Sequence, residues 1–224
     1  RFSQFLMKSG RARFCEKTPS NCLRLRFIEA LYPDARLIHL VRDGRSVVAS
    51  MMRMLSKAPD ADRVKARLAE TPWRDLPALA PVFLRDTVER RLAGRKPFWG
   101  PRPPGWREWL DLPVPLMLAR QWRTLVETAL RDLTAFPSEH QCQIRYEDFV
   151  AAPREGLTGL LDLAGLRGDP DFLETTAAEV RPSSFADEWR QTLSDEAIAQ
   201  IETEAGPLLE QLGYSLTSTP ARPS

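Results

Sequence analysis

A short run of strand-forming residues followed by an Asp-Gly turn constrains the fold of this chain of 224 residues more than any other feature. The run occupies residues 37–41 (LIHLV), with Pro33 and Asp34 before it and Asp43 and Gly44 after it. A continuous, largely apolar run of this kind predicts a strand that is covered on both faces in a parallel sheet. We therefore expect an α/β fold built around this strand.

The sequence changes to helical periodicity directly after the turn. Apolar residues recur at helical spacing from Gly44 onward, at Val47, Val48, Met51, Met54 and Leu55. This spacing leaves another side of the same helix to the polar residues Arg45, Ser46, Ser50 and Arg53. The segment therefore predicts a strand-turn-helix unit.

Arg42 and Ser50 are candidate phosphate ligands within this unit. In open parallel sheets, ligands bind beyond the carboxyl ends of the strands, where helix N-termini present N–H groups. A guanidinium can bind two phosphate oxygens and a hydroxyl can donate a further bond, and the eight-residue step places both groups on one face. The alternative is a turn with a local ion pair.

Lys17 is a candidate catalytic residue on an earlier turn. Residues 12–15 could form a second strand, and residues 18–21 (TPSN) are typical of a turn and N-cap before a helix. A lysine ammonium is a compact charge, which suits a transferring group whose oxygens gain charge in the transition state.

Three motifs together resemble the sulfotransferases that use 3′-phosphoadenosine 5′-phosphosulfate (PAPS). They are residues 16–19 (EKTP), residues 41–45 (VRDGR) with Ser50, and residues 144–150 (IRYEDFV) with Pro153. The likeness is closest to tyrosylprotein sulfotransferases and their bacterial relatives, and it touches most of the chain outside residues 59–112. It implies a helix-rich fold of the P-loop-containing nucleotide-hydrolase type, with a short parallel sheet flanked by helices.

The resemblance also implies roles for individual residues. Arg42 and Ser50 would bind the 3′-phosphate of PAPS, and Tyr146 would contact the nucleotide. Lys17 would lie near the sulfuryl group and stabilise its oxygens as the S–O bond breaks. Ser184 is the candidate for a further nucleotide contact near the end of the chain.

Structural roles are the alternatives for several of these positions. Tyr146 could be a core residue at a strand end, and residues 147–148 could be a solvated turn. His39 lies within the strand, where we expect a hydrogen-bonded core histidine and not a catalytic base. Glu16 beside the candidate lysine suits a turn or an ion pair.

The sequence departs from the family pattern at its start. The Gly-rich loop that cradles the 5′-phosphosulfate has no clear counterpart, residues 8–11 (KSGR) being the nearest candidate. Pro19 stands where some cytosolic relatives have a histidine base. We therefore expect an amino-terminally truncated domain, whose loop and glutamate base precede Arg1.

Length and composition favour a single domain over residues 1–216 with a disordered tail at 217–224. Residues 59–112 are a possible insertion, whose tryptophans either cover an acceptor or pin a Pro-rich loop to the core. Strands are expected at 36–41 and 141–146. Helices are expected at 2–8, 21–31, 44–57, 60–71, 78–93, 113–135, 153–165, 170–179 and 194–212.

Charge and cysteine content narrow the possible partners. A net charge of +2 does not indicate nucleic-acid binding, and no apolar run is long enough to cross a membrane. Three cysteines without metal-ligand spacing favour reduced thiols and no metal site. The composition resembles that of a bacterial protein, so we expect a cytoplasmic location.

The expected activity is transfer of a sulfuryl group from PAPS to an acceptor hydroxyl of a tyrosine, a sugar or a small alcohol. Positioning and charge stabilisation would supply the rate, without a covalent intermediate or a metal. One alternative is a non-catalytic nucleotide- or partner-binding remnant. A nucleotide-dependent phosphotransferase is less favoured, because it needs a Lys-Ser/Thr loop and an acidic strand end that the sequence lacks.

Overall fold

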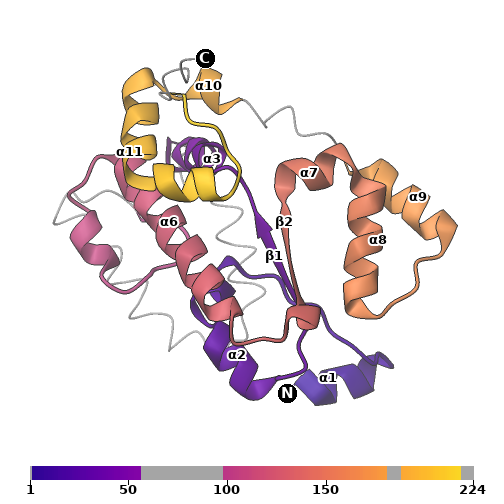
Figure 1. Cartoon of the computed structure of the whole chain (residues 1–224). Coiled ribbons are helices and arrows are strands. Elements are labelled where there is room, and N and C mark those ends of the chain that lie inside the picture. Colours follow the sequence, from indigo (N-terminus) through magenta and orange to yellow (C-terminus); the bar gives the residue numbers. More distant parts are fainter. Residues whose placement is uncertain (1, 57–97, 181–187, 218–224) are drawn as a thin grey trace.

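The computed structural model describes residues 2–56, 98–180 and 188–217, and it shows helices around a short sheet (Figure 1). The helices are α1 (Phe2–Ser9), α2 (Leu25–Leu31), α3 (Gly44–Ser56), α6 (Val114–Leu133), α7 (Tyr146–Ala151), α8 (Pro153–Ala164), α9 (Pro170–Glu179), α10 (Trp189–Thr192) and α11 (Asp195–Gln211). Short 3₁₀ helices are η1 (Pro19–Leu23), η2 (Trp106–Trp109) and η3 (Ser138–His140). The helices predicted at 60–71 and 78–93 lie outside the described residues.

Two parallel strands, β1 (Leu37–Val41) and β2 (Gln141–Arg145), form the sheet in the described part of the chain. Val41 pairs with Arg145, so both strands end at the same edge. The residues that follow them therefore leave the sheet side by side. The second strand suggested at residues 12–15 is not formed: this segment has no regular secondary structure.

The described helices cover β1 on one face. Val41 packs against Trp122 and Val126 of α6 and against apolar residues of α11, whereas Ile38 and Leu40 are 46% and 52% exposed. The expectation that both faces of this strand are covered is therefore wrong for the described structure. The strand alternates between a buried and an exposed face, as half-covered strands do.

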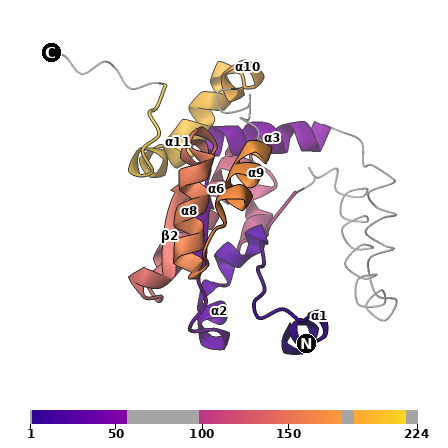
Figure 2. The same cartoon turned by 90° about the vertical axis from the view of Figure 1, so that its right-hand side faces the viewer.

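The core lies between α3, α6 and α11, which pack against one another beside β1, while α8 lies on the β2 side of the molecule with α9 packed against it (Figures 1 and 2). Its centre includes Val48 of α3, Met117 and Leu118 of α6, and Ile201 of α11, all fully buried. Apolar residues of all three helices pack into this shared core, and the helical spacing of those in α3 had predicted that helix. Ser194 caps α11 by accepting the Ala197 N–H at 3.2 Å.

Gly44 permits the close approach of α3 to α6. A Cβ atom at this position would lie 2.8 Å from Cδ2 of Trp122, which is closer than carbon atoms pack. The glycine of the predicted Asp-Gly turn therefore also serves helix packing. It brings the start of α3 against the indole ring that lies under the end of β1.

Two helical segments differ from the prediction. The helix expected at 21–31 is divided at Arg24 into η1 and α2. Residues 147–148, for which a solvated turn was the alternative, lie in the first turn of α7. Acidic residues favour the start of a helix because they interact with the positive end of its dipole.

The described part of the possible insertion, residues 98–112, is attached to the core. Trp106 is buried against Phe98, with a ring-centroid distance of 4.9 Å, and the Arg102 and Arg107 guanidinium carbons lie 4.8 and 4.7 Å from its ring centroid. Trp109 also packs on the core, whereas Trp99 is 48% exposed. Of the two predicted roles, pinning to the core describes Trp106 and Trp109. An acceptor-covering insertion at 59–112 stays a prediction.

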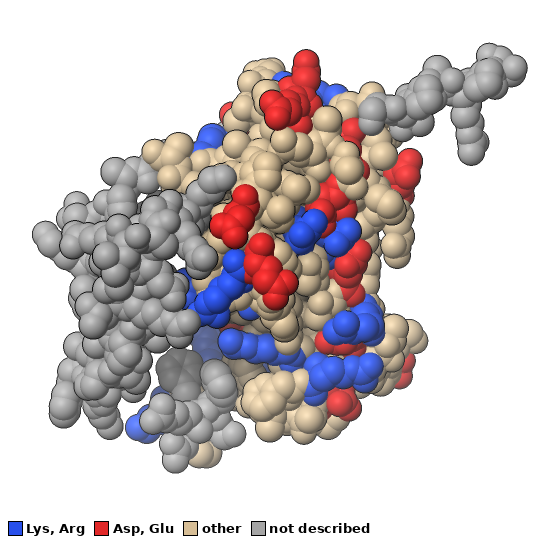
Figure 3. All heavy atoms as spheres, turned by 90° about the vertical axis from the view of Figure 1, so that its left-hand side faces the viewer, with Lys and Arg blue, Asp and Glu red and all other residues tan. Residues whose placement is uncertain are grey.

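Acidic and basic side chains are intermixed on the face of the molecule shown in Figure 3. Ion pairs also connect elements: Glu204 of α11 lies 2.7 Å from Arg120 and 3.0 Å from Arg123 of α6. On this face of the described residues, acidic and basic side chains therefore alternate.

Candidate active site at the carboxyl edge of the sheet

The structure brings Arg42 and Tyr146 together. Each residue directly follows one strand of the parallel pair, and the Arg42 guanidinium carbon lies 4.6 Å from the Tyr146 ring centroid. Both residues are half-buried. A cation over an aromatic face at this distance is attracted by the ring quadrupole. Tyr146 begins α7 and faces Arg42, so it is neither the last residue of a strand nor buried in the core.

Ser50 lies on α3, two turns into the helix. The rise of about 1.5 Å per residue puts it about 9 Å along the axis from Gly44. It is half-buried. The loop around Gly100 lies against the same part of α3, since a Cβ atom on Gly100 would be 3.7 Å from Cε of Met51.

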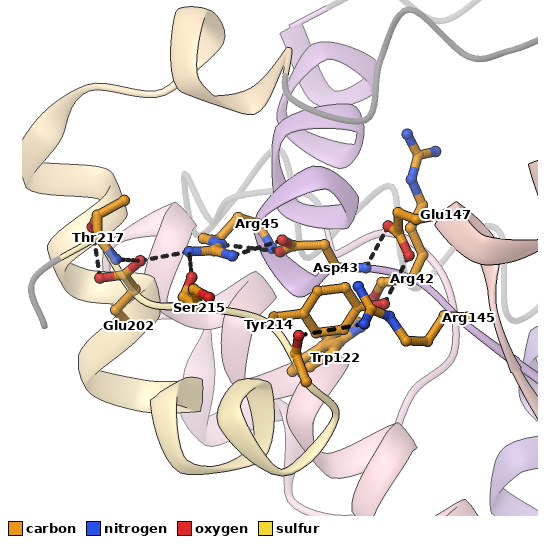
Figure 4. A network of polar contacts seen from close by, with 11 residues as sticks. Arg42, Asp43, Arg45, Trp122, Arg145, Glu147, Glu202, Tyr214, Ser215 and Thr217 are labelled. Atoms are coloured by element: carbon orange, nitrogen blue, oxygen red, sulfur yellow. Dashed lines mark hydrogen bonds and ion pairs between the residues drawn. The ribbon is translucent and has the colours of Figure 1, made fainter. Parts of the chain in front are cut away.

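Arg45, expected on the polar side of the helix, is instead 2% exposed and fully engaged (Figure 4). Its guanidinium donates to both carboxylate oxygens of Asp43 at 3.0 and 2.7 Å and to Glu202 Oε1 at 2.8 Å. Burial by itself lowers the pKa of Arg45, but the bonds and charges of Asp43 and Glu202 outweigh burial and raise it. Arg45 is therefore a charged structural residue.

Asp43 also caps the start of α3. Its Oδ1 accepts the Arg45 backbone N–H at 2.8 Å. We expected the helix N-terminus to present its N–H groups to a phosphate, and for this group the expectation is wrong because a carboxylate already occupies it. Arg42 and Ser50 are the side-chain candidates for binding an anion at this edge.

Glu147 connects both strand ends to the segment after α11 (Figure 4). Its Oε1 accepts the Asp43 backbone N–H at 3.1 Å, and its Oε2 accepts the Tyr214 hydroxyl at 2.8 Å. Burial, and then the bond to Glu147, raise the pKa of Tyr214 well above its ordinary value, so the phenol stays protonated as a donor. Sequence reasoning missed this role, which the position of Glu147 directly after Tyr146 could have suggested.

The peptide group between Arg42 and Asp43 is held on both sides. Its carbonyl accepts the Trp122 indole N–H at 3.2 Å, and its N–H donates to Glu147. In Figure 4 the Arg42 side chain extends away from the network around Arg45. The backbone that carries Arg42 is therefore fixed by α6 and α7.

Lys17 is exposed and lies on an irregular segment just before η1. The preceding Glu16 accepts hydrogen bonds from the Thr18 hydroxyl and the Asn21 side-chain amide, which confirms its turn role. Ser184, the other predicted nucleotide contact, lies outside the described residues. Its role stays a prediction.

His39 occupies the core position predicted for it. Its Nδ1 lies 3.2 Å from Gln143 Oε1 on the neighbouring strand, and the side chain is buried. Burial lowers the pKa of His39, and the bond to Gln143 opposes this shift. The histidine is therefore a hydrogen-bonded member of the sheet.

Several other predictions concern cysteines, metals and membranes. Cys15, Cys22 and Cys142 are all unpaired, as reduced thiols would be. Across residues 2–56, 98–180 and 188–217, no group of three potential metal ligands occurs. None of the helices described has the length and hydropathy needed to cross a membrane.

Sequence comparisons identify the family. A sequence profile of the sulfotransferase family matches residues 2–75 and 78–171. Carbohydrate sulfotransferase 2 from Mus musculus and from Homo sapiens are each 25% identical over 202 residues, which cover 84% of this chain and 36% of the relative. The chain thus spans little more than a third of the length of these relatives.

A solved structure shares the fold. The sulfotransferase domain from the curacin biosynthetic pathway superimposes with a TM-score of 0.58 at 19% identity, covering 96% of this chain and 68% of that one. This likeness confirms the predicted helix-rich α/β fold with a short parallel sheet. With three quarters of its sequence matched by the family profile, the chain belongs to the sulfotransferase family.

Proposed function

We propose that this chain binds PAPS and transfers its sulfuryl group to an acceptor hydroxyl. The observation that carries the proposal is the placement of Arg42 over Tyr146 at the shared carboxyl edge of β1 and β2. In parallel sheets this edge is where ligands bind. Family membership supports the donor, since sulfotransferases of this kind use PAPS.

The residues at this edge suit the 3′-phosphate of the donor. Arg42 offers a guanidinium whose backbone is fixed on both sides, and Ser50 offers a hydroxyl on the adjoining helix. A charge-assisted bond from a guanidinium is about twice as strong as a neutral one. Tyr146 would support Arg42 from beneath and lie beside the nucleotide.

Transfer would proceed by attack of the acceptor oxygen on sulfur as the bond from sulfur to the 5′-phosphate oxygen breaks. The acceptor proton passes to a base, and adenosine 3′,5′-bisphosphate leaves. Lys17 would stabilise the charge that develops on the departing oxygen. Its exposed position at the surface is compatible with contact to a bound ligand.

A sugar hydroxyl is the acceptor that the comparisons favour among the three considered. Both curated relatives are named carbohydrate sulfotransferase 2. A tyrosine and a small alcohol are the alternatives, and the EKTP and VRDGR motifs resemble most closely those of the tyrosylprotein branch and its bacterial relatives. Incubation with radiolabelled PAPS and one acceptor of each class would identify the acceptor directly.

Calorimetric titration with adenosine 3′,5′-bisphosphate tests the donor site. Arg42→Ala should weaken binding by about 2–5 kcal/mol, the cost of truncating one partner of a buried charge pair. Arg36→Ala is the matched control, because this exposed arginine flanks the opposite end of β1 and donates to the Glu139 carbonyl at 3.0 Å. Unchanged affinity in a folded Arg42→Ala protein would refute the proposed site.

A further inference from the structure

The end of β1 is held by two consecutive residues of the β2-to-α7 junction. Tyr146 lies under the Arg42 guanidinium at 4.6 Å, and Glu147 accepts the Asp43 N–H at 3.1 Å. One residue therefore contacts the side chain of Arg42, and the next fixes the backbone beside it. Because the two strands are parallel and in register, this junction lies directly beside the arginine.

Glu147 is itself oriented by Tyr214, which follows α11. The tyrosine hydroxyl donates to Glu147 Oε2 at 2.8 Å, leaving Oε1 directed at the Asp43 N–H. The Tyr214 ring is 5% exposed and packs in the same cluster as Val41 and Trp122. The hydroxyl is thus held by a rigid ring in the core.

Arg145 covers the other side of this tyrosine. Its guanidinium carbon lies 4.4 Å from the Tyr214 ring centroid, and its Nη1 donates to the Gly213 carbonyl at 3.3 Å. Gly213 has φ of +82°, a left-handed conformation that glycine adopts without strain. This turn brings Tyr214 back to the sheet after α11 ends.

We propose that Tyr214 and Glu147 are positioning residues that orient the Arg42–Asp43 peptide and so direct the Arg42 guanidinium to the 3′-phosphate of the nucleotide. This inference rests on the proposed function. The peptide group is one rigid plane, and Trp122 and Glu147 hold its two polar atoms. Loss of the Tyr214 hydroxyl would release Glu147, and with it one of the two constraints on that plane.

The test compares adenosine 3′,5′-bisphosphate with adenosine 5′-phosphate, which lacks the 3′-phosphate. Tyr214→Phe should weaken binding of the bisphosphate about tenfold and leave binding of the monophosphate unchanged. The preference ratio, which is the dissociation constant of the monophosphate divided by that of the bisphosphate, should therefore fall about tenfold. A general loss of stability would affect both ligands alike. Glu147→Ala removes the acceptor of the Asp43 N–H and of the Tyr214 hydroxyl, so it should lower the ratio at least as much as Tyr214→Phe does.

A double-mutant cycle decides whether the effect passes through Arg42. In an Arg42→Ala background, Tyr214→Phe should cause no further loss of bisphosphate affinity, because the group it positions is absent. Tyr32→Phe is the matched control, since this tyrosine lies at the surface edge-on to Phe14, and it should leave the ratio unchanged.

The outcomes separate this inference from the proposed function. A wild-type protein that binds the two nucleotides equally, or an Arg42→Ala variant that keeps the wild-type ratio, would overturn both. A wild-type preference for the bisphosphate that survives Tyr214→Phe and Glu147→Ala would overturn the positioning role alone. The positioning role alone would also be overturned if Tyr214→Phe weakened bisphosphate binding equally in the wild-type and Arg42→Ala proteins.

Discussion

Nη1 of Arg45 lies 2.8 Å from Oε1 of Glu202, which joins the first turn of α3 to the middle of α11 across 157 residues of sequence. The two side chains are 3% and 4% exposed. Glu202 also accepts the backbone N–H of Thr217 at 2.9 Å and its hydroxyl at 2.8 Å. A single buried carboxylate therefore connects α3, α11 and the segment after α11.

Glu202→Ala should lower the free energy of unfolding by about 1–3 kcal/mol. Arg45 keeps its ion pair with Asp43, but the variant removes one acceptor of the buried guanidinium and the acceptor of both Thr217 donors. Urea unfolding followed by circular dichroism measures the change.

The matched control is Glu188→Ala, because Glu188 pairs with Arg53 of α3, also at 2.8 Å. The Arg53 and Glu188 side chains are 38% and 33% exposed. Solvent screens that pair, so its loss should cost no more than about 1 kcal/mol. Equal costs for the two variants would show that the Arg45–Glu202 pair is not a principal support of the fold.

Gly44→Ala should destabilise the protein by about 1–3 kcal/mol, although alanine usually favours helices. The new Cβ atom would lie 2.8 Å from the Trp122 ring, so α3 would have to move away from α6. Thermal unfolding measures the loss.

Gly159→Ala provides the comparison within α8, where a Cβ atom meets nothing within 4 Å. It should stabilise by up to about 1 kcal/mol, because alanine loses less backbone entropy in a helix. A stabilising Gly44→Ala would mean that α3 does not depend on this close approach.

Local pattern predicted most elements of the fold. The start of α3 at Gly44 follows from a turn and a periodicity that lie within a dozen residues, and helices matching α6 and α11 were also predicted from local sequence. None of the three required knowledge of distant partners. The half-covered face of β1 was missed because an apolar run does not specify how many helices pack on it.

The candidate site was predictable only in part. Arg42 and Tyr146 were identified through their motifs, and the parallel register then explains why they meet. Arg45 was misplaced, and Glu147 was given no role beyond a possible solvated turn, because a polar residue in a pattern is assigned to the surface. Their partners, Glu202 and Tyr214, lie 157 and 67 residues away, beyond the reach of any local pattern.

Acidification should weaken the fold through His39. Burial, the largest cause, lowers its pKa below the ordinary value of 6.5, so near pH 6 the unfolded chain binds more protons at this histidine than the folded chain does. This contribution to stability is complete above about pH 6.5 and is lost as the pH falls toward the folded pKa, with a slope of at most about 1.4 kcal/mol per pH unit.

Urea unfolding at pH 7.5 and pH 5.5, in wild-type protein and in His39→Asn, isolates this effect. The packing cost of the substitution is common to both pH values and cancels in the difference. The variant should show a smaller loss of stability on acidification than the wild type. An identical loss in both proteins would mean that His39 binds protons alike in the folded and unfolded states.

Lys17→Ala should reduce kcat far more than nucleotide affinity. The residue is exposed on an irregular segment, so its removal should leave the fold intact. A charge that acts mainly in the transition state contributes about 10²–10³-fold to kcat. Rapid-quench measurement of sulfuryl transfer, with bisphosphate affinity from calorimetry, separates the two quantities. Arg36→Ala, at the exposed position before β1, should change neither. Equal losses in kcat and affinity for Lys17→Ala would assign this lysine to nucleotide binding instead.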